Sequence, residues 1–559
     1  MSESLPAHSP ESPVPLGNGG DLLVRVLREH GVAVVFGIVS VHNLPLVEAV
    51  ARDLRFVAVR HEAAAVNAAD AYARASGGLG CALTSTGTGA GNAAGSLVEA
   101  LSAGSRILHV TGNIEAGFLG QGRGVIHETK DQLGMLTAVS KAAYTVTSAA
   151  AAPGILRVAA AAASAYPSGP VSVEWPIDLQ YAPQADAAVT ALAARTAAGA
   201  APEGTGAAAA LLAAARRPAI WAGGGARDAG APLRELAGRL GAAIFTSNAG
   251  RGSVPEDHDL VIGNFAASPG GSALLAQADV LLSVGTHFRS NETAHYKLAL
   301  PAAHIQVDLD PAALGRCYPV TLGLAGEAAA TLTALSAALP AVTQAEAGWA
   351  GKVTAARAAT RASLYRDIGP YGLICDSMRR HLPAASPIAR DVTIPSSQWG
   401  NRLLPILDPG TNVFPLGGGI GQGLAMGVGA ALARPDVPTL VIAGDGGLAV
   451  HLGELMTLAQ ERPWLVLVVF NDGGYGVLRN MQDKYLERRS GVDLFTPDFG
   501  LLAAAVDIPF TRVKDAAAFD EAFAAAVAEH GPYLVEVDIT SVGPTPVQFT
   551  PPVAIPGRH

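Results

Sequence analysis

The sequence predicts an α/β protein built from doubly wound domains with parallel sheets. Short apolar segments typical of buried strands alternate with segments of helical periodicity along most of the chain. Glycine-rich turns follow several of these strands, for example in TLVIAGDGG and WLVLVVFNDGG. The length of 559 residues allows about three or four domains, because a domain takes roughly 150 residues.

The composition restricts the classes of partner. Half of the residues are hydrophobic and 15% are charged, which predicts large buried cores. The net charge is −9 and Lys and Arg form no cluster, so we expect no nucleic-acid partner. The apolar runs are shorter than the ~20 residues of a membrane span, so we expect no membrane partner. Cys81, Cys317 and Cys375 are far apart, which indicates free thiols in a reducing cytoplasm.

The amino-terminal region divides into an arm and a first domain. Residues 1–19 are polar and rich in Pro, Ser and Gly, without the basic and apolar regions of a signal peptide. We expect them to form a disordered arm, and the protein to be cytoplasmic. Residues 20–180 alternate between helical and strand patterns and are predicted to form the first doubly wound domain.

Three residues of this first domain are candidates for chemistry. Glu62 begins an alanine-rich helix directly after a predicted strand, and apolar surroundings favour a raised pKa for its carboxyl group. Stabilisation of the helix N-terminus by the carboxylate is the alternative. His42 and His127 lie in loops and are candidates for substrate contact or proton transfer, with ordinary packed or exposed histidines as the alternative.

The middle of the chain is predicted to be a second α/β domain, at residues 207–338. Ala-rich segments at 181–206 and 339–365 are expected to connect it to its neighbours. The glycines at 223–225 lack the full GxGxxG context of a dinucleotide site. We therefore expect this domain to be structural, and bound FAD remains an open alternative.

The third domain, expected at residues 366–545 and followed by a Pro-rich tail at 546–559, contains a strand, helix, strand unit. Asp445 follows its first strand and Asp472 its second. Both carboxylates should meet at one sheet edge, because parallel strands end there together. The glycines after Asp445 leave backbone N–H groups bare at a helix N-terminus, which suits a phosphate, and the carboxylates suit Mg²⁺. Ordinary turn sequences are the alternative.

GDGG followed by NDGGYG resembles the diphosphate and Mg²⁺ motif of thiamine diphosphate enzymes, the superfamily of acetohydroxyacid synthase and benzoylformate decarboxylase. The resemblance covers nearly the whole chain after the arm. It implies pyrimidine-binding, central and diphosphate-binding domains, in that order. It also makes Asp445, Asp472 and the Gly474 carbonyl the metal ligands, although this family usually has Asn at position 472.

The resemblance also implies the contacts of the cofactor. VRHEAAAVNAADAYAR is similar to the family's glutamate motif, in which the glutamate, here Glu62, hydrogen-bonds the aminopyrimidine ring and favours its imino tautomer. The Gly418 carbonyl then accepts from the 4′-amino group, and Ile420 is the bulky side chain over which the cofactor bends. The other implied cofactor-binding residues are Ser396, Gly446, Gly447, Tyr475 and Gly476.

The implied function is decarboxylation of a small-molecule 2-oxo acid through an enamine, which is protonated to give an aldehyde. The stretches around both histidines look most like decarboxylases of the 2-ketoarginine type. The catalytic His that benzoylformate decarboxylase carries in its first Gly-rich loop is replaced by Ser85 here, so that mechanism does not transfer whole.

Three alternatives to this function are considered. An acetolactate synthase-like carboligase would join the enamine to a second carbonyl compound. A dinucleotide-dependent oxidoreductase, from another class, would leave Glu62 and the paired aspartates without a task. A thiamine diphosphate-binding protein that has lost catalysis would be expected to lack Glu62, which this chain has. In the resembling family one cofactor bridges the first and third domains of two subunits, which implies a homodimer at minimum and a homotetramer as the usual assembly.

Overall fold

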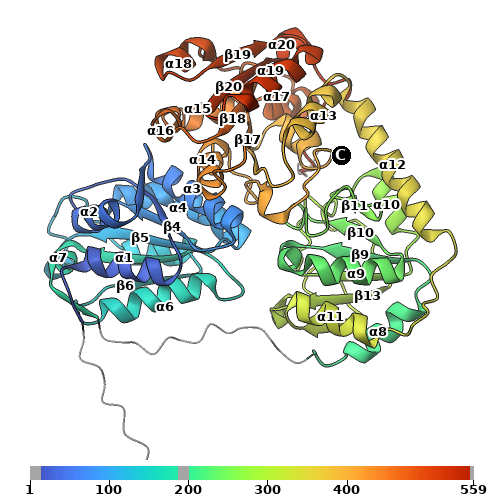
Figure 1. Cartoon of the computed structure of the whole chain (residues 1–559), viewed down its shortest axis with the longest axis horizontal. Coiled ribbons are helices and arrows are strands. Elements are labelled where there is room, and N and C mark those ends of the chain that lie inside the picture. The colour runs from blue at the N-terminus through green and yellow to red at the C-terminus, as the bar shows by residue number, and fades with distance from the viewer. Residues whose placement is uncertain (1–13, 187–200, 554–559) are drawn as a thin grey trace, which may run out of the picture. The chain divides into compact units, whose positions relative to one another are not determined.

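The computed structural model describes residues 14–186 and 201–553 of the chain. They group into two units: the first takes its described residues from Met1–Ala73 and Gly78–Arg195, and the second from Arg74–Gly77 and Thr196–His559. Three six-stranded parallel sheets with flanking helices form these units (Figure 1), which confirms the predicted α/β fold class. Parts of three predicted segments lie outside the described residues. They are residues 1–13 of the arm, residues 187–200 of the first connector and residues 554–559 of the tail.

The sheet of the first unit has the strand order β3-β2-β4-β5-β7-β6. Its strands are β2 (Val34–Gly37), β3 (Arg55–Ala58), β4 (Gly80–Thr84), β5 (Ile107–Asn113), β6 (Ala142–Thr145) and β7 (Val171–Pro176). A separate antiparallel pair is formed by β1 (Val14–Leu16), which precedes these strands in the chain, and β8 (Gln184–Asp186), which follows them. Its helices are α1 (Gly19–Glu29), α2 (Leu44–Asp53), α3 (Glu62–Ser76), α4 (Thr88–Ala103), α5 (Gln132–Val139), α6 (Ala152–Ser164) and α7 (Ile177–Tyr181).

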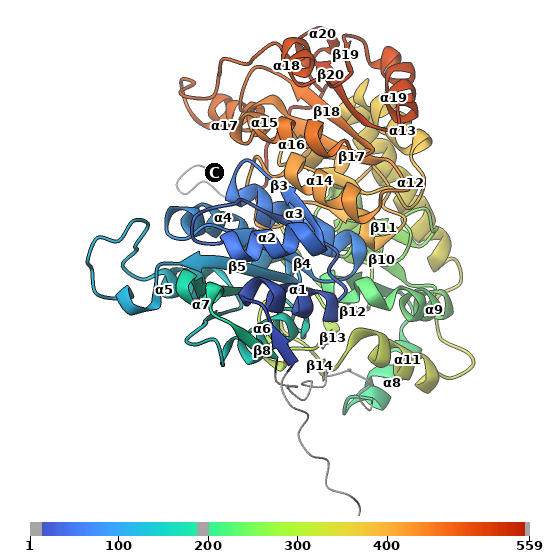
Figure 2. The same cartoon turned by 60° about the vertical axis from the view of Figure 1, so that its left-hand side comes forward.

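The switch point of the first sheet lies between β2 and β4. β4, β5 and β7 are buried along their whole length, as expected for parallel strands with helices on both faces. The strand order reverses at β2 and β4, so the loops after these two strands diverge, and ligands bind in α/β sheets at such a point. The segment between β5 and α5 extends away from the sheet (Figure 2).

The central sheet, in the second unit, has the order β11-β10-β9-β12-β13-β14. Its strands are β9 (Pro218–Ala222), β10 (Ala243–Thr246), β11 (Val261–Gly263), β12 (Val280–Val284), β13 (Ala303–Asp308) and β14 (Leu322–Ala325). Its helices are α8 (Thr205–Ala214), α9 (Gly230–Leu240), α10 (Pro269–Leu275) and α11 (Ala328–Ala338). The predicted second connector contains most of a long helix, α12 (Trp349–Ile368).

The third sheet, also in the second unit, has the order β16-β15-β17-β18-β20-β19, which repeats the topology of the first sheet. Its strands are β15 (Ile388–Arg390), β16 (Asn412–Val413), β17 (Thr439–Gly444), β18 (Leu465–Asn471), β19 (Phe510–Val513) and β20 (Pro532–Asp538). Its helices are α13 (Tyr371–His381), α14 (Gly423–Ala433), α15 (Asp445–Val450), α16 (Glu454–Glu461), α17 (Gly476–Tyr485), α18 (Phe499–Ala505), α19 (Phe519–Ala528) and α20 (Ile539–Val542). Its switch point lies between β15 and β17.

Across the described ranges, no helix combines the length and the apolar character that crossing a bilayer requires.

Candidate functional site

The predicted site residues form two clusters, one in each unit. His42, Glu62 and His127 belong to the first unit, and the predicted diphosphate and metal residues belong to the second. Each cluster lies at the carboxyl edge of its own sheet, because its residues follow the ends of parallel strands.

Glu62 is held in a defined position at the start of α3. Its side chain is buried, and Oε2 accepts a hydrogen bond from the Asn92 amide at 3.0 Å. A Cβ atom on Gly89, in the first turn of α4, would lie only 2.7 Å from Glu62 Oε1. Glycine at position 89 therefore makes room for the carboxylate. The contact with Asn92 was not predicted from the sequence, because it joins two helices that are distant in the chain.

The structure brings the two candidate histidines together. Their Nδ1 atoms are 3.4 Å apart and the rings meet edge to face, with centroids 5.2 Å apart. Burial lowers the pKa of His42, and the charge of His127 lowers it further, whereas Glu115 raises it. His127 has a φ of 67°, in the left-handed region that is uncommon for a residue other than glycine.

Two glycines allow the histidine loops to approach their neighbours closely. A Cβ atom on Gly112 would lie 2.3 Å from the His42 carbonyl oxygen, and a Cβ atom on Gly87 would lie 2.3 Å from the His127 carbonyl oxygen. These distances are far below any real contact. The backbone of each histidine is therefore fixed by a position where only glycine fits.

Gln132 connects the same loops to the interior of the sheet. Its Oε1 accepts from the Gly87 N–H at 2.8 Å and from the Thr86 hydroxyl at 3.0 Å. Its Nε2 donates to the Gly112 carbonyl at 3.0 Å and to Glu174 Oε2 at 3.1 Å. Burial raises the pKa of Glu174, which is otherwise held by hydrogen bonds from neighbouring side chains.

Glu128, the residue after His127, stabilises its own loop. Its carboxylate oxygens accept from the backbone N–H groups of Gly122, Gly124 and Val125 at 2.9 to 3.2 Å. These bonds engage both of its oxygens within residues 122–128.

Asp445 and Asp472 lie next to each other in the second cluster. The Asp472 N–H donates to Asp445 Oδ1 at 3.4 Å, and Asp445 Oδ2 is buried without a hydrogen-bond partner among the described residues. Burial raises the pKa of both carboxyl groups, and the charge of Asp445 helps to raise that of Asp472 to about 6. A buried carboxylate with an unpartnered oxygen next to a second, half-buried carboxylate fits a bound cation.

The third predicted ligand, the Gly474 carbonyl, faces the start of α15. Its oxygen lies 2.8 Å from the position that a Cβ atom on Gly446 would occupy. The described residues contain no group of three or more His, Cys, Asp or Glu side chains that could hold a metal. A metal here would therefore need the backbone carbonyl and external oxygen ligands beside the two carboxylates, which fits the hard-cation chemistry of Mg²⁺.

Arg479, on α17, was not anticipated from the sequence. Its Nη1 lies 3.7 Å from Asp472 Oδ2 and donates to the Asp472 carbonyl at 3.1 Å, while Nη2 donates to the Gly473 carbonyl at 3.1 Å. Its Nε donates to Asp493 Oδ1 at 2.8 Å. Arg479 therefore fixes the turn after β18 and places a positive charge beside the carboxylate at position 472.

Asp391, at the end of β15, organises the glycine-rich loop before α14. Its carboxylate is buried and accepts from the N–H groups of Gly421 at 3.0 Å and Gly423 at 3.2 Å. Burial raises the pKa of Asp391 to about 6. A Cβ atom on Gly447 would lie 3.2 Å from Asp391 Oδ2, so this loop and the start of α15 are adjacent. Gly418, in the same loop, has a φ of 86°.

The remaining predicted diphosphate residues surround the aspartates or follow β15. Gly476 begins α17, and a Cβ atom there would lie 1.9 Å from Asp472 Oδ2. A Cβ atom on Gly446 would lie 2.8 Å from the Tyr475 ring. Ser396 begins a π-helix, Ser396–Gly400, and its buried hydroxyl has no partner among the described residues. Ile420 is 39% exposed, so its side chain is available at the surface of the unit.

Comparison with known proteins identifies three domain models of one family along the chain. The N-terminal TPP binding domain of thiamine pyrophosphate enzymes matches residues 17–135. The central domain of these enzymes matches residues 205–335, and their C-terminal TPP binding domain matches residues 395–537. Thiamine pyrophosphate is another name for thiamine diphosphate.

Individual relatives align over almost the full length. A Pseudomonas aeruginosa protein named probable 2-ketoarginine decarboxylase AruI is 34% identical, over 94% of this chain and 95% of that protein. A Methanocaldococcus jannaschii protein named probable acetolactate synthase large subunit is 27% identical, over 97% of this chain and 94% of that protein. An X-ray structure assigned to a thiamin diphosphate-dependent enzyme from Mycobacterium smegmatis has a TM-score of 0.77 at 22% identity, and covers 94% of this chain and 99% of its own.

Proposed function

Because this chain belongs to the thiamine pyrophosphate enzymes, we propose that it decarboxylates a small 2-oxo acid to an aldehyde, with thiamine diphosphate and Mg²⁺ as cofactors. When bound, thiamine diphosphate supplies a nucleophilic carbon and accepts the electron pair that the departing CO₂ leaves. The observation that carries the decarboxylase assignment is the contact between His42 and His127, because it provides a proton-holding pair that an aldehyde-forming reaction needs.

The second cluster is proposed to hold the metal and the diphosphate. Asp445, Asp472 and the Gly474 carbonyl supply oxygen ligands to Mg²⁺, and the unpartnered Asp445 Oδ2 supports this role. The buried hydroxyl of Ser396, which has no partner among the described residues, suits a phosphate oxygen. The diphosphate residues are Ser396, Gly446, Gly447, Tyr475 and Gly476.

The first cluster is proposed to act on the organic end of the cofactor and on the substrate. Glu62, held by Asn92, shares a proton with the pyrimidine ring. The Gly418 carbonyl and the Ile420 side chain, which belong to the second unit, are proposed to orient the pyrimidine ring of the cofactor. One of the paired imidazoles must donate at Nδ1 and the other must accept, so the pair can hold a proton and deliver it to the product carbon.

The central domain is proposed to bind no flavin. At its switch point the Gly223 N–H donates to the Val284 carbonyl at 2.8 Å and the Gly225 N–H donates to the Gly285 carbonyl at 3.0 Å. A Cβ atom on Gly223 would lie 2.1 Å from the Gly285 carbonyl oxygen. The loops after β9 and β12 therefore contact each other where a dinucleotide would otherwise enter.

A carboligase is the second candidate function, favoured by the acetolactate synthase name of the M. jannaschii relative. It differs only in whether a proton or a second carbonyl compound captures the product carbon. Family membership favours both over the dinucleotide-dependent oxidoreductase. We further propose a homodimer as the minimum active unit and a homotetramer as the assembly, to be measured by light scattering after size-exclusion chromatography.

The test is to quantify products and bound cofactor together. A panel of aliphatic, aromatic and guanidinium-bearing 2-oxo acids is supplied with thiamine diphosphate and Mg²⁺, and CO₂, aldehyde and hydroxyketone are measured. We expect CO₂ and aldehyde in equal amounts from at least one substrate. Hydroxyketone as the main product would favour the carboligase, and purified protein that holds NAD or FAD but binds no thiamine diphosphate would overturn both.

A further inference from the structure

Arginine side chains make many of the contacts that hold an irregular segment of the third domain, residues 396–406. It begins with the π-helix Ser396–Gly400 and continues without regular structure to Ile406. Its backbone carbonyls accept hydrogen bonds from Arg251 and Arg390 at Gly400, Arg361 at Leu403, Arg251 at Leu404 and Arg379 at Pro405. The first of these arginines belongs to the central domain, and the others lie on α12, α13 and β15.

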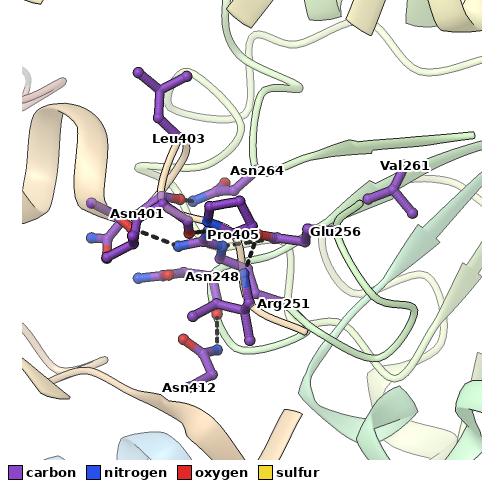
Figure 3. A network of polar contacts seen from close by, with 12 residues as sticks. Asn248, Arg251, Glu256, Val261, Asn264, Asn401, Leu403, Pro405 and Asn412 are labelled. Atoms are coloured by element: carbon purple, nitrogen blue, oxygen red, sulfur yellow. Dashed lines mark hydrogen bonds and ion pairs between the residues drawn. The ribbon is translucent and has the colours of Figure 1, made fainter. Parts of the chain in front are cut away.

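Arg251 makes two of these contacts from a fully buried position in the loop after β10. Its Nη1 donates to the Gly400 carbonyl at 2.8 Å and its Nη2 to the Leu404 carbonyl at 2.6 Å. Nε and Nη2 also pair with both oxygens of buried Glu256, at 2.8 Å and 2.6 Å. Figure 3 shows Arg251 and Glu256 side by side next to Asn401. The orientation of the guanidinium is therefore fixed by the Glu256 carboxylate together with the two backbone carbonyls.

Glu256 binds the far end of the same segment. Its Oε2 accepts from the Ile406 N–H at 2.9 Å, and its own N–H donates to the Ile406 carbonyl at 3.1 Å. Asn264 adds a contact to the Asn401 carbonyl at 3.3 Å. The central domain thus forms hydrogen bonds with segment 396–406 at Gly400, Asn401, Leu404 and Ile406.

Gly400 connects the contacts of the central domain to Ser396, because both residues belong to the same π-helix. The Asn401 N–H donates to the Ser396 carbonyl at 2.8 Å, which closes the wide turn of the π-helix directly after Gly400. Trp399, in the same turn, is buried and meets Phe470 edge to face, with centroids 6.0 Å apart. Phe470 lies near the end of β18, the strand that leads to Asp472. A shift of Gly400 would therefore move both Ser396 and the support of the metal loop.

We propose that Arg251, a central-domain side chain, is a positioning residue for the diphosphate half of the cofactor site. It fixes Gly400 so that the π-helix presents the Ser396 hydroxyl toward the ligand. The inference rests on the proposed function, because Ser396 is assigned to the diphosphate there. On this proposal the central domain supports the cofactor site of the third domain without binding a ligand itself.

The test uses a double variant, Arg251→Met with Glu256→Gln, which removes both charges of the buried ion pair together and keeps an acceptor for the Ile406 N–H. The matched control is Arg239→Met, which removes an arginine that donates to the carbonyls of Ser336, Leu339 and Pro340 at the end of α11. Thiamine diphosphate affinity is measured on the metal-supplied apoprotein by calorimetry, together with the thermal midpoint. Arg251→Lys serves as a second variant that keeps a buried positive charge opposite Glu256.

We expect the double variant to raise the Kd for thiamine diphosphate about tenfold or more, and Arg239→Met to leave it unchanged at a similar loss of thermal stability. Arg251→Lys should raise the Kd in the same direction, because one ammonium cannot reach both carbonyls. Adding Ser396→Ala to the double variant should raise the Kd no further than the larger single effect, because both changes act through the same hydroxyl.

Three results separate the hypotheses. If the wild-type protein does not bind thiamine diphosphate, the proposed function itself fails. If the wild type binds it and the Arg251 variants match the Arg239 control, the positioning role is wrong. If the effects of the Arg251 and Ser396 changes add fully, Arg251 does not act through Ser396 and the inference is overturned.

Discussion

His42 and His127 place their Nδ1 atoms 3.4 Å apart although 85 residues separate them in the chain. Each comes from a loop at the carboxyl edge of the first sheet, and each loop is seated on a glycine, Gly112 or Gly87, whose Cβ would collide with the histidine carbonyl. The pair is therefore fixed by the backbone before any substrate binds. Such preorganisation is what a proton donor requires.

Replacing either histidine should slow the reaction and change its products. We expect His127→Ala and His42→Ala to lower kcat by roughly 10²- to 10⁴-fold, the usual contribution of a positioned proton donor. The fraction of hydroxyketone should rise, because a slower protonation leaves more time for a second carbonyl compound. His381→Asn, which removes a histidine paired with Asp520 in the third domain, is the control. Unchanged product ratios in both variants would assign the pair to substrate binding alone.

Binding of Mg²⁺ and thiamine diphosphate should stabilise the protein through Asp445. A ligand mixture at 100 times its Kd should raise the free energy of unfolding by about 2.7 kcal/mol. We expect Asp445→Asn to lose most of this increase, because it removes the charge of the carboxylate whose Oδ2 has no partner among the described residues. The measurement is denaturant unfolding with and without the ligands, and EDTA should reverse the effect. Asp520→Asn should keep the full increase; an equal loss in both variants would contradict the metal assignment.

Asp391 should give the metal-free protein a measurable pH dependence. Burial raises its pKa from 3.8 to about 6 in the folded state. Between these values the folded protein binds more protons than the unfolded chain, so the free energy of unfolding falls as pH rises and levels off above about 6. Two pKa units correspond to about 3 kcal/mol.

The check compares the wild type with Asp391→Asn across that window. The difference in unfolding free energy between the two proteins should change by about 2 kcal/mol between pH 4 and pH 6. Other carboxyl groups, Asp472 among them, are present in both proteins and cancel in the comparison. If the unfolding free energies of the two proteins changed in parallel with pH, the pKa of Asp391 would be the same in the folded and unfolded states, which would contradict the prediction.

Gln132 should affect turnover more than cofactor affinity. Gln132→Leu removes the acceptor for the Gly87 N–H and the donor to Gly112, which lie beneath the two histidines. We expect a loss of about 1 to 3 kcal/mol in unfolding free energy and a fall in kcat, with the Kd for thiamine diphosphate unchanged. Gln184→Leu, which removes a buried amide donor to the Leu179 and Ala182 carbonyls, is the control for stability alone. Equal kcat values in the two variants would make Gln132 merely structural.

The elements of this fold are visible in the sequence, whereas several contacts at the sites are not. Asp445 and Asp472 each follow an apolar strand, and β17 and β18 pair in register from Thr439 with Leu465 to Gly444 with Phe470, so both acids leave the sheet at one edge. Local periodicity is enough for that conclusion. The contact of Arg479 with Asp472 needs the turn geometry after β18, which the letters NDGGYG do not specify.

Contacts between domains are further from what a sequence pattern can show. Arg251 and Gly400 are 149 residues apart, and their hydrogen bond depends on how the central and third domains pack. The π-helix at Ser396–Gly400 was likewise not predicted, because its wide turn is stabilised by these distant partners rather than by the propensity of its residues. The roles assigned to Glu62, Ser396 and the histidines stay predictions until they are measured.

Glu62 can be tested through a neighbour as well as directly. Glu62→Gln should lower kcat by roughly 10²- to 10⁴-fold in a protein that still folds, because the amide cannot share a proton with the pyrimidine ring. Gly89→Ala should produce a milder loss, since its Cβ would lie 2.7 Å from Glu62 Oε1 and displace the carboxylate.

Gly95→Ala, on the same helix α4, is the matched control because nothing lies within 4 Å of its Cβ. Both alanines raise the intrinsic helix propensity by about 1 kcal/mol, so a difference between them reports the contacts of the Cβ at position 89, with Glu62 Oε1 and with the Ser85 side chain, rather than the helix. Turnover with the 2-oxo acid identified in the product panel is the measurement. If Gly89→Ala keeps the activity of Gly95→Ala while Glu62→Gln is inactive, the carboxylate tolerates displacement and its exact position is not what catalysis needs.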